Sequence, residues 1–171
     1  MARELGDLCY NIPNESIYGE FSKHSIYQLW KQFLHLKHNH VLDIGSGSGF
    51  TLSYFATFAQ QVTGIEISKE RVSLSLSVLQ QLHLSIPWNI VHQDIMHMSN
   101  LPESCTHSFH FDKTFPLVLR QKIATLETQS SSIVCVATCH RDLYVDWTYQ
   151  SSCTCTMRGS GQKMTMHIFV R

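Results

Sequence analysis

A glycine-rich turn at residues 43–49 is the feature that most constrains how this chain can fold. A short apolar run leads into Asp43, and from Gly45 onward every second residue of the turn is a glycine. A helical pattern of apolar residues opens at Phe50. A strand, a tight glycine-rich turn and a helix, in this order, form the first half of a Rossmann-type unit. Glycines suit such a turn because a Cβ would collide where the backbone bends sharply and approaches a ligand.

A second short strand is predicted at residues 62–66, and it also ends in an acid, Glu66. Glu66 follows Gly45 by about 20 residues, the distance at which an acidic side chain can take the ribose hydroxyls of a nucleoside. The two segments together therefore predict a ligand with a nucleoside part at the carboxyl ends of these strands.

Apolar periodicity extends this unit to an open α/β sheet. Amphipathic helices are predicted to begin after Ser22 and Ser68, each suited to be an N-cap, and at Leu117. Further apolar or alternating segments predict strands at residues 88–92, 108–111, 132–138, 143–157 and 163–170. The last two flank a turn signal and are expected to pair as an antiparallel hairpin. Residues 1–40 are interpreted as an N-terminal arm and helix, and residues 41–171 as one domain.

Composition narrows the class of protein. Hydrophobic residues make up 43% of the 171 residues, which suits a globular domain, and the formal net charge is zero. Nothing in the overall charge therefore indicates nucleic acid or a membrane surface. The cysteines are scattered apart from the pair Cys153 and Cys155, which favours reduced thiols in a reducing compartment. His35, His38 and His40 cluster before the first strand, but no cysteine or acid completes a metal site, so no metal is expected.

The acids and glycines of the turn resemble those of class I S-adenosylmethionine-dependent methyltransferases. Nicotinamide enzymes usually lack an acid just before the first glycine, whereas Asp43 here precedes Gly45 by two positions. The resemblance implies a Rossmann-like seven-stranded sheet with helices on both faces and a C-terminal antiparallel hairpin. It also implies S-adenosyl-L-methionine as the cofactor.

The same resemblance implies which residues bind this cofactor. Glu66 would hold the ribose, and Asp94, just past the third strand, would contact the adenine amino group. Asp43 would fix either the glycine-rich turn or the cofactor amine. The other cofactor-binding positions that the resemblance implies are Ile44, Gly45, Ser46, Gly47, Gly49, Ile67, Ile95 and Asp112.

A second resemblance concerns Tyr18, Gly19 and Glu20, which precede Asp43 at the spacing found in the disruptor-of-telomeric-silencing (non-SET) histone lysine methyltransferases. In that family a Tyr-Gly-Glu loop folds over the methionine end of the cofactor, so these three residues are implied as cofactor ligands. The last turn and strand, residues 158–167, are also similar to that family's last hairpin.

The expected acceptor loop departs from that family. Its Asn-Asn-Phe motif appears here as residues 113–115, or as Asp112 and Lys113 displaced by one, and only Phe115 clearly survives. The resemblance implies Phe115, Tyr18 and Lys113 as catalytic residues, while simple core packing is the alternative role for Phe115. The basic extensions by which that family binds nucleosomes are missing from this sequence.

The expected activity is methylation of a protein lysine, with a core histone in a nucleosome as the substrate and the nucleus as the location. Any contact with nucleic acid is expected to be indirect and weak, and no membrane contact is expected. Two alternatives stay open. One is a methyltransferase acting on another protein or a small molecule, in the cytoplasm, and the other is a catalytically silent module that binds the cofactor.

Overall fold

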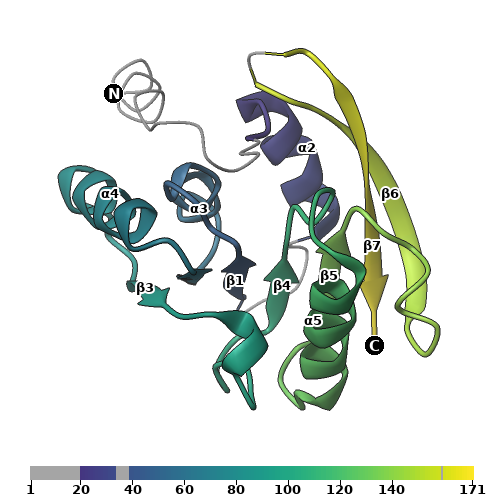
Figure 1. Cartoon of the computed structure of the whole chain (residues 1–171). Coiled ribbons are helices and arrows are strands. Elements are labelled where there is room, and N and C mark those ends of the chain that lie inside the picture. Colours follow the sequence, from purple (N-terminus) through teal and green to yellow (C-terminus); the bar gives the residue numbers. More distant parts are fainter. Residues whose placement is uncertain (1–19, 34–38, 159) are drawn as a thin grey trace.

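Seven strands form one sheet with helices on both faces (Figure 1). The computed structural model describes residues 20–33, 39–158 and 160–171. The strands are β1 (His40–Ile44), β2 (Gln61–Glu66), β3 (Trp88–His92), β4 (His107–Phe109), β5 (Cys135–Thr138), β6 (Thr148–Thr156) and β7 (Lys163–Val170). The helices are α2 (Lys23–Phe33), α3 (Phe50–Phe55), α4 (Lys69–Gln81), α5 (Leu117–Gln129) and the 3-10 helix η1 (Ile95–His97). Within the described residues, no helix combines the length and the apolar character needed to cross a membrane.

The order of the strands is β3-β2-β1-β4-β5-β7-β6. Neighbouring strands from β3 to β5 run parallel, whereas β7 is antiparallel to both β5 and β6. The predicted Rossmann-like sheet with a C-terminal antiparallel hairpin is therefore confirmed. In such a sheet the ligand crevice lies outside the carboxyl ends of the strands, where the strand order reverses. Here that point lies between β1 and β4.

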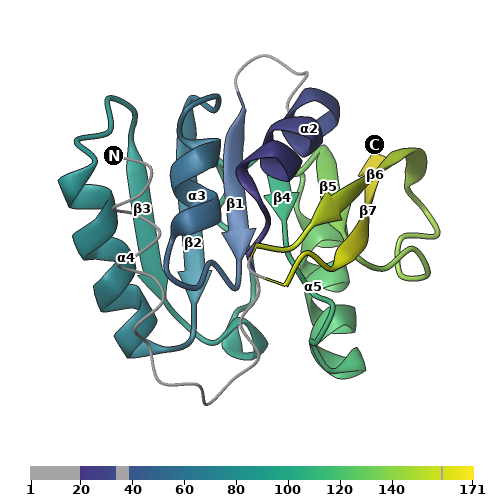
Figure 2. The same cartoon turned by 90° about the horizontal axis from the view of Figure 1, so that it is seen from above.

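The sheet separates two apolar cores. Helices α2, α3 and α4 lie side by side on one face, and α5 and η1 lie on the other (Figure 1 and Figure 2). The first core lies on the side of α2, α3 and α4, and the second core on the side of α5 and η1. Side chains of β1 alternate between them, so that Val41 belongs to the first core and Leu42 to the second. Phe55 and Phe109 pack edge to face in the first core, with ring centroids 5.1 Å apart. Helix α2 adds Phe33 to the same core. The predicted division of the chain into residues 1–40 and 41–171 stays a prediction.

Some predicted boundaries are wrong, most clearly in the hairpin. Residues 143–147 form turns rather than a strand, and β6 begins only at Thr148. Tyr144 and Trp147 are buried, and the Trp147 N–H donates to the Tyr144 carbonyl at 3.2 Å. Leu143, Val145 and Trp147 stand at alternate positions, as they would in a strand. In the structure, Tyr144 and Trp147 instead anchor a loop to the second core.

The buried face of α4 also differs from the one that periodicity predicts. The predicted buried stripe comprises Val72, Leu76, Leu79, Gln80 and Leu82. Leu76 is only partly buried and Gln80 is exposed, whereas Ser75 and Val78 are buried. The Ser75 hydroxyl donates to the Gly47 carbonyl at 2.8 Å. Because this hydrogen bond requires Ser75 to face the glycine-rich turn, a polar residue belongs to the buried face of the helix, and apolar periodicity cannot indicate it. The predicted N-cap, Ser68, is confirmed, since its side chain accepts from the Arg71 N–H.

Gly64 in the middle of β2 lets the glycine-rich turn fold back over the sheet. A Cβ on Gly64 would lie 2.5 Å from the Ser46 Oγ, 2.8 Å from the Ser46 Cβ and 2.9 Å from the Ile90 Cδ1. Distances this short do not occur between real side chains, so the turn could not keep its place above a larger residue. The position of the glycine-rich turn therefore depends on Gly64, a strand residue with no motif signal in the sequence.

We expect Gly64→Ala to lower the free energy of unfolding by about 1–3 kcal/mol, the usual cost of overpacking a core. The measurement is urea unfolding followed by circular dichroism. Gly161→Asn is the matched control, because a Cβ there meets no described atom within 4 Å and Asn tolerates a positive φ. An unchanged free energy of unfolding for Gly64→Ala would show that Ser46 moves aside without cost.

Candidate cofactor and acceptor site

A cavity of about 580 Å³ opens at the carboxyl ends of β1, β2 and β4, where the sheet topology places the crevice. Its size lies within the usual range for small-molecule sites, roughly 300–1,000 Å³. The lining includes Ile44, Gly45, Glu66, Ile67, Asp94, Ile95, Phe111 and Phe115. The structure therefore brings predicted cofactor residues and a predicted acceptor residue to one cavity.

The turn between β1 and α3 has the backbone conformation that its glycines predict. Gly45, Gly47 and Gly49 have φ values of 78°, 56° and 77°, a region that other residues rarely adopt. The Gly45 and Ser46 N–H groups both donate to the Ile65 carbonyl, at 2.8 and 3.1 Å. These bonds tie the turn to the end of β2, next to the cavity.

Glu66 is buried at the end of β2, and its carboxylate braces two loops. One oxygen accepts from the Gly47 N–H and the other from the Ser68 N–H, each at 2.9 Å. The side chain therefore joins the glycine-rich turn to the start of α4. Because each carboxylate oxygen can accept more than one hydrogen bond, the predicted contact with ribose hydroxyls is still available.

Asp43 lies buried beneath the turn, and its Oδ2 has no hydrogen-bond partner among the described residues. Burial, reinforced by the nearby charge of Glu66, raises the pKa of this carboxyl to about 8, although His110 acts in the opposite direction. A buried carboxylate oxygen without a donor suits a cationic ligand group, because such a group both donates hydrogen bonds and removes the electrostatic cost. Of the two roles predicted for Asp43, this environment favours contact with the cofactor amine.

Asp94 and Ile95 lie on the other side of the cavity, beyond β3. The Asp94 carboxylate caps η1 by accepting from the Met96 N–H at 2.9 Å and lies 3.6 Å from the His97 Nδ1. Its side chain is 30% exposed, so it can reach a ligand in the cavity. Ile67 lines the same cavity and is mostly exposed.

Glu20 reaches the glycine-rich turn from the start of the described chain. Its carboxylate accepts from the Ser48 hydroxyl at 2.9 Å and lies 3.5 Å from the Arg158 Nη1. The Arg158 N–H donates to the Glu20 carbonyl at 2.7 Å, and Phe21 forms a bridge with Met157. The segment is thus held between the cofactor turn and the last hairpin. Tyr18 and Gly19 lie outside the described residues.

The predicted acceptor loop divides into two parts. Phe115 lines the cavity, and its ring lies so close to the turn that a Cβ on Gly45 would be 2.8 Å from the Cζ. Lys113 is exposed and does not line the cavity. Asp112 is buried and accepts from the Thr138 hydroxyl and the Cys139 N–H, at 2.9 and 2.8 Å. Lys113 and Asp112 therefore do not line the cavity. The same holds for other predicted residues of the turn and its neighbourhood, namely Glu20, Asp43, Ser46, Gly47 and Gly49.

The comparison with protein families gives the class of this site. Residues 42–121, from β1 into α5, match the model of a methyltransferase domain. This chain contains a class I methyltransferase domain. Among the described residues of the domain, no three His, Cys, Asp or Glu side chains are grouped so that they could hold a metal ion. His35 and His38 of the predicted cluster lie outside the described residues.

Solved structures share the fold of this methyltransferase domain at low sequence identity. Magnesium protoporphyrin IX methyltransferase (ChlM) from Synechocystis PCC 6803, solved with bound S-adenosylmethionine, has 16% identity and a TM-score of 0.68 over 87% of this chain and 79% of that chain. N-methyltransferase NodS from Bradyrhizobium japonicum WM9 has 10% identity and a TM-score of 0.67 over 87% and 95%. TrmN from Thermus thermophilus has 13% identity and a TM-score of 0.74 over 99% and 52%. No curated protein sequence matches the chain.

The expected cofactor of the methyltransferase domain is S-adenosylmethionine, which supplies an electrophilic methyl group on a sulfonium. Residues in and beneath the cavity fit the three parts of the cofactor. Glu66, which lines the cavity, offers acceptors for the ribose, and Asp94 with its apolar neighbours suits the adenine. Asp43 does not line the cavity but lies buried beneath the turn, and its carboxylate oxygen without a partner among the described residues suits the ammonium. The Ser46 side chain packs against Gly64, and its buried Oγ has no hydrogen-bond partner among the described residues.

We expect the affinity for S-adenosylhomocysteine, which has the same amino-acid end, to rise with pH between about pH 6 and 7.5. Asp43 is protonated in this range because its pKa is raised to about 8, and pairing with the ligand ammonium requires its ionised form. Binding should therefore release one proton, and affinity should increase up to about tenfold per pH unit. Calorimetry in phosphate and in Tris buffer would measure the released proton.

Asp43→Asn is the control for this prediction. The variant should bind more weakly at pH 7.5 and should lose both the pH dependence and the proton release. Proton release that persists in Asp43→Asn would assign the titration to another group.

Proposed function

We propose that this protein transfers the methyl group of S-adenosylmethionine to a lysine of another protein, with a core histone in a nucleosome as the substrate. The observation that carries this proposal is the position of Glu20, held against the glycine-rich turn by Ser48 and against the last hairpin by Arg158. Glu20 belongs to the Tyr-Gly-Glu segment that resembles the non-SET histone lysine methyltransferases. The proposal places the enzyme in the nucleus.

Methyl transfer is an in-line displacement, so the protein contributes chiefly by holding the donor and acceptor in line. Glu66, Asp43 and Asp94 bind the cofactor, while Phe111 and Phe115 wall the side of the cavity that is open to an acceptor. A lysine must lose its proton before it can attack. Apolar walls favour the neutral amine, because they disfavour the charged form and exclude water.

Contact with a nucleosome requires positive charge at the protein surface. The net charge of the chain is zero, so the proposal relies on a local patch on the exposed face of α2, formed by Lys23 and Lys31. A further lysine of the same segment, Lys37, lies outside the described residues. With so few basic residues, we propose that any contact with DNA is weak and that histone contacts carry recognition.

A second candidate acceptor, a small molecule with an apolar body, is favoured by the rim of the cavity. Three large apolar side chains that line it are strongly exposed: Ile67 by 62%, Met96 by 40% and Val118 by 60%. Exposed apolar groups gathered at one opening often mark a contact surface. Such a rim would suit the body of an apolar substrate better than the charged surface of a nucleosome.

We expect Glu66→Ala to weaken binding of S-adenosylhomocysteine by at least about tenfold, because each charge-assisted hydrogen bond contributes roughly 1.5–3 kcal/mol. The variant also loses the brace between Gly47 and Ser68. Glu66→Gln keeps the shape and one acceptor oxygen, so its affinity should fall between those of the wild type and Glu66→Ala. Equal affinity of the wild type and a folded Glu66→Ala variant, measured by calorimetry, would contradict the assignment of this residue.

The acceptor is tested by incubating the protein with methyl-labelled cofactor and nucleosomes, free histones or a small-molecule extract. We expect label on nucleosomal histone, and Phe115→Ala should lower this transfer by roughly tenfold or more because the acceptor loses one wall. Tyr149→Ala, on the edge strand β6 away from the cavity, is the control and should keep full activity.

Each other outcome of this assay has its own meaning. Label only in the small-molecule extract would overturn the histone proposal in favour of the second candidate. Binding of the cofactor without label in any fraction would favour the silent module.

A further inference from the structure

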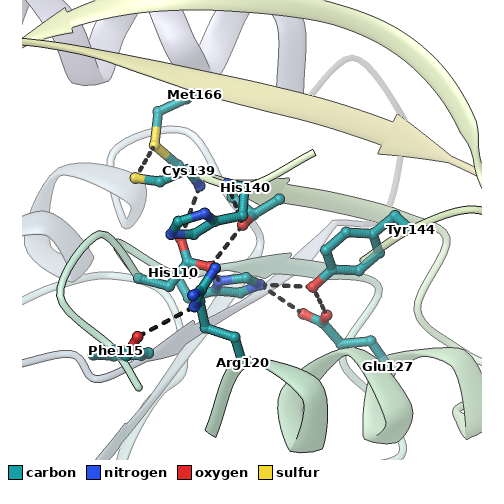
Figure 3. A network of polar contacts seen from close by, with 10 residues as sticks. His110, Phe115, Arg120, Glu127, Cys139, His140, Tyr144 and Met166 are labelled. Atoms are coloured by element: carbon teal, nitrogen blue, oxygen red, sulfur yellow. Dashed lines mark hydrogen bonds and ion pairs between the residues drawn. The ribbon is translucent and has the colours of Figure 1, made fainter. Parts of the chain in front are cut away.

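A buried polar network lies at the carboxyl end of β4, between the sheet and α5 (Figure 3). At its centre is His110, which is 1% exposed. Its Nδ1 lies 3.4 Å from the Asp112 carboxylate, and its Nε2 lies 3.3 Å from the Glu127 carboxylate. The same Nε2 lies 3.1 Å from the Tyr144 hydroxyl, which donates to Glu127. The residues come from β4 and its following loop, from α5 and from the loop before β6.

The charges in this network compensate one another. Burial by itself lowers the pKa of His110, but the carboxylates of Glu127 and Asp112 outweigh burial and raise it to about 10. Burial likewise opposes ionisation of Asp112, but His110 and the donors of Thr138 and Cys139 hold the pKa of this carboxyl well below its usual range. His110 is therefore an imidazolium between two acidic side chains at neutral pH.

The network is joined directly to the loop that carries Phe115. Asp112 is the first residue of this loop, and its carbonyl accepts from the Phe115 N–H at 3.1 Å. At the far end of the loop the Arg120 Nε donates to the Phe115 carbonyl at 3.2 Å. The Asp112 carboxylate, held by His110, is fixed to the end of β5 through Thr138 and Cys139. The loop is thus pinned at both ends, and its buried end depends on His110.

We infer that His110 is a positioning residue for methyl transfer: by holding Asp112 and Glu127 together, it keeps residues 112–116, and with them Phe115, in place beside the cofactor cavity. This inference rests on the proposed methyltransferase activity. His110 does not line the cavity, so it acts through Asp112 and the loop and not on the reacting atoms.

The positive charge of His110 is the property that matters. Asp112 and Glu127 are both almost fully buried, and Asp43 is a third buried acid that His110 affects. A buried acid that loses its partner ion is strongly destabilised. A neutral residue at position 110 would therefore leave both acids without their partner ion. Asp112, which begins a surface loop, would then be held only by the Thr138 and Cys139 donors.

The test compares His110→Gln with His107→Gln. His107 is equally buried but is the first residue of β4, whereas His110 follows the last one. The His107 Nδ1 pairs with the Thr106 hydroxyl at 2.9 Å. We expect His110→Gln to lower kcat on nucleosomes at least tenfold. The Kd for S-adenosylhomocysteine should change less than fivefold when it is measured above the pKa of Asp43, because His110 lowers that pKa and its loss would otherwise weaken binding. Hydrogen exchange should rise in the peptide covering residues 111–117 and not in α4. His107→Gln should produce neither the loss of kcat nor the local rise in exchange.

A rescue variant keeps the inference testable if His110→Gln folds poorly. In His110→Gln/Asp112→Asn the acid at the start of the loop is replaced by a neutral residue whose amide oxygen can still accept from the Cys139 N–H, so protection of residues 111–117 and at least half of the lost kcat should return. Loss of kcat without local exchange, equal effects of His107→Gln, or no recovery in the double variant would each overturn the inference. If the wild type labels no acceptor, the proposed function fails, but the exchange and binding measurements still decide whether His110 holds the loop.

Discussion

The Glu66 carboxylate is the interaction on which the site depends most. It stands at the end of β2 and accepts one hydrogen bond from the turn after β1 and another from the start of α4. Two loops that follow different strands are thereby fixed relative to each other at the mouth of one cavity. If this acid were absent, the Gly47 amide would lose its acceptor and β2 would hold the turn only through the bonds to the Ile65 carbonyl. One side chain thus both builds the cavity and offers acceptors to its ligand.

The elements that the sequence predicts well are those whose signal is local. The turn at residues 43–49 combines a strand, glycines and an acid within a few positions, and each of these requirements is visible in the sequence. The Ser68 cap and the strand at residues 88–92 are local in the same sense, and both occur as predicted. The carboxyl ends of parallel strands meet at one edge of a sheet, so the sequence alone is enough to place Glu66 and Asp94 near one another.

The parts that could not be predicted depend on partners far away in the sequence. His110 meets Tyr144 and Glu127, residues on two later elements, and nothing near His110 in the sequence distinguishes it from the other histidines of the chain. Gly64 is required by Ser46, which lies on another loop. The loop at residues 143–147 resembles a strand in sequence because Leu143, Val145 and Trp147 stand at alternate positions. Val145 is nevertheless 83% exposed, and the buried aromatic anchors, Tyr144 and Trp147, are three residues apart. Such contacts are set by packing in three dimensions and leave no periodic signal.

Asp43 and Asp112 show why a buried acid near a cavity is not in itself a ligand-binding residue. Both are almost fully buried, and cofactor binding is predicted for both from the sequence. Asp112 has its charge satisfied from within the protein by a hydroxyl, a backbone amide and the His110 imidazolium, so ionisation costs little and the side chain has no need of a ligand. Asp43 has an oxygen without any such donor among the described residues, and its pKa is raised accordingly. A bound cation can remove the electrostatic cost of ionising Asp43 in its buried position. The two acids therefore serve different purposes, because Asp112 holds the acceptor loop and Asp43 favours binding of the cofactor ammonium.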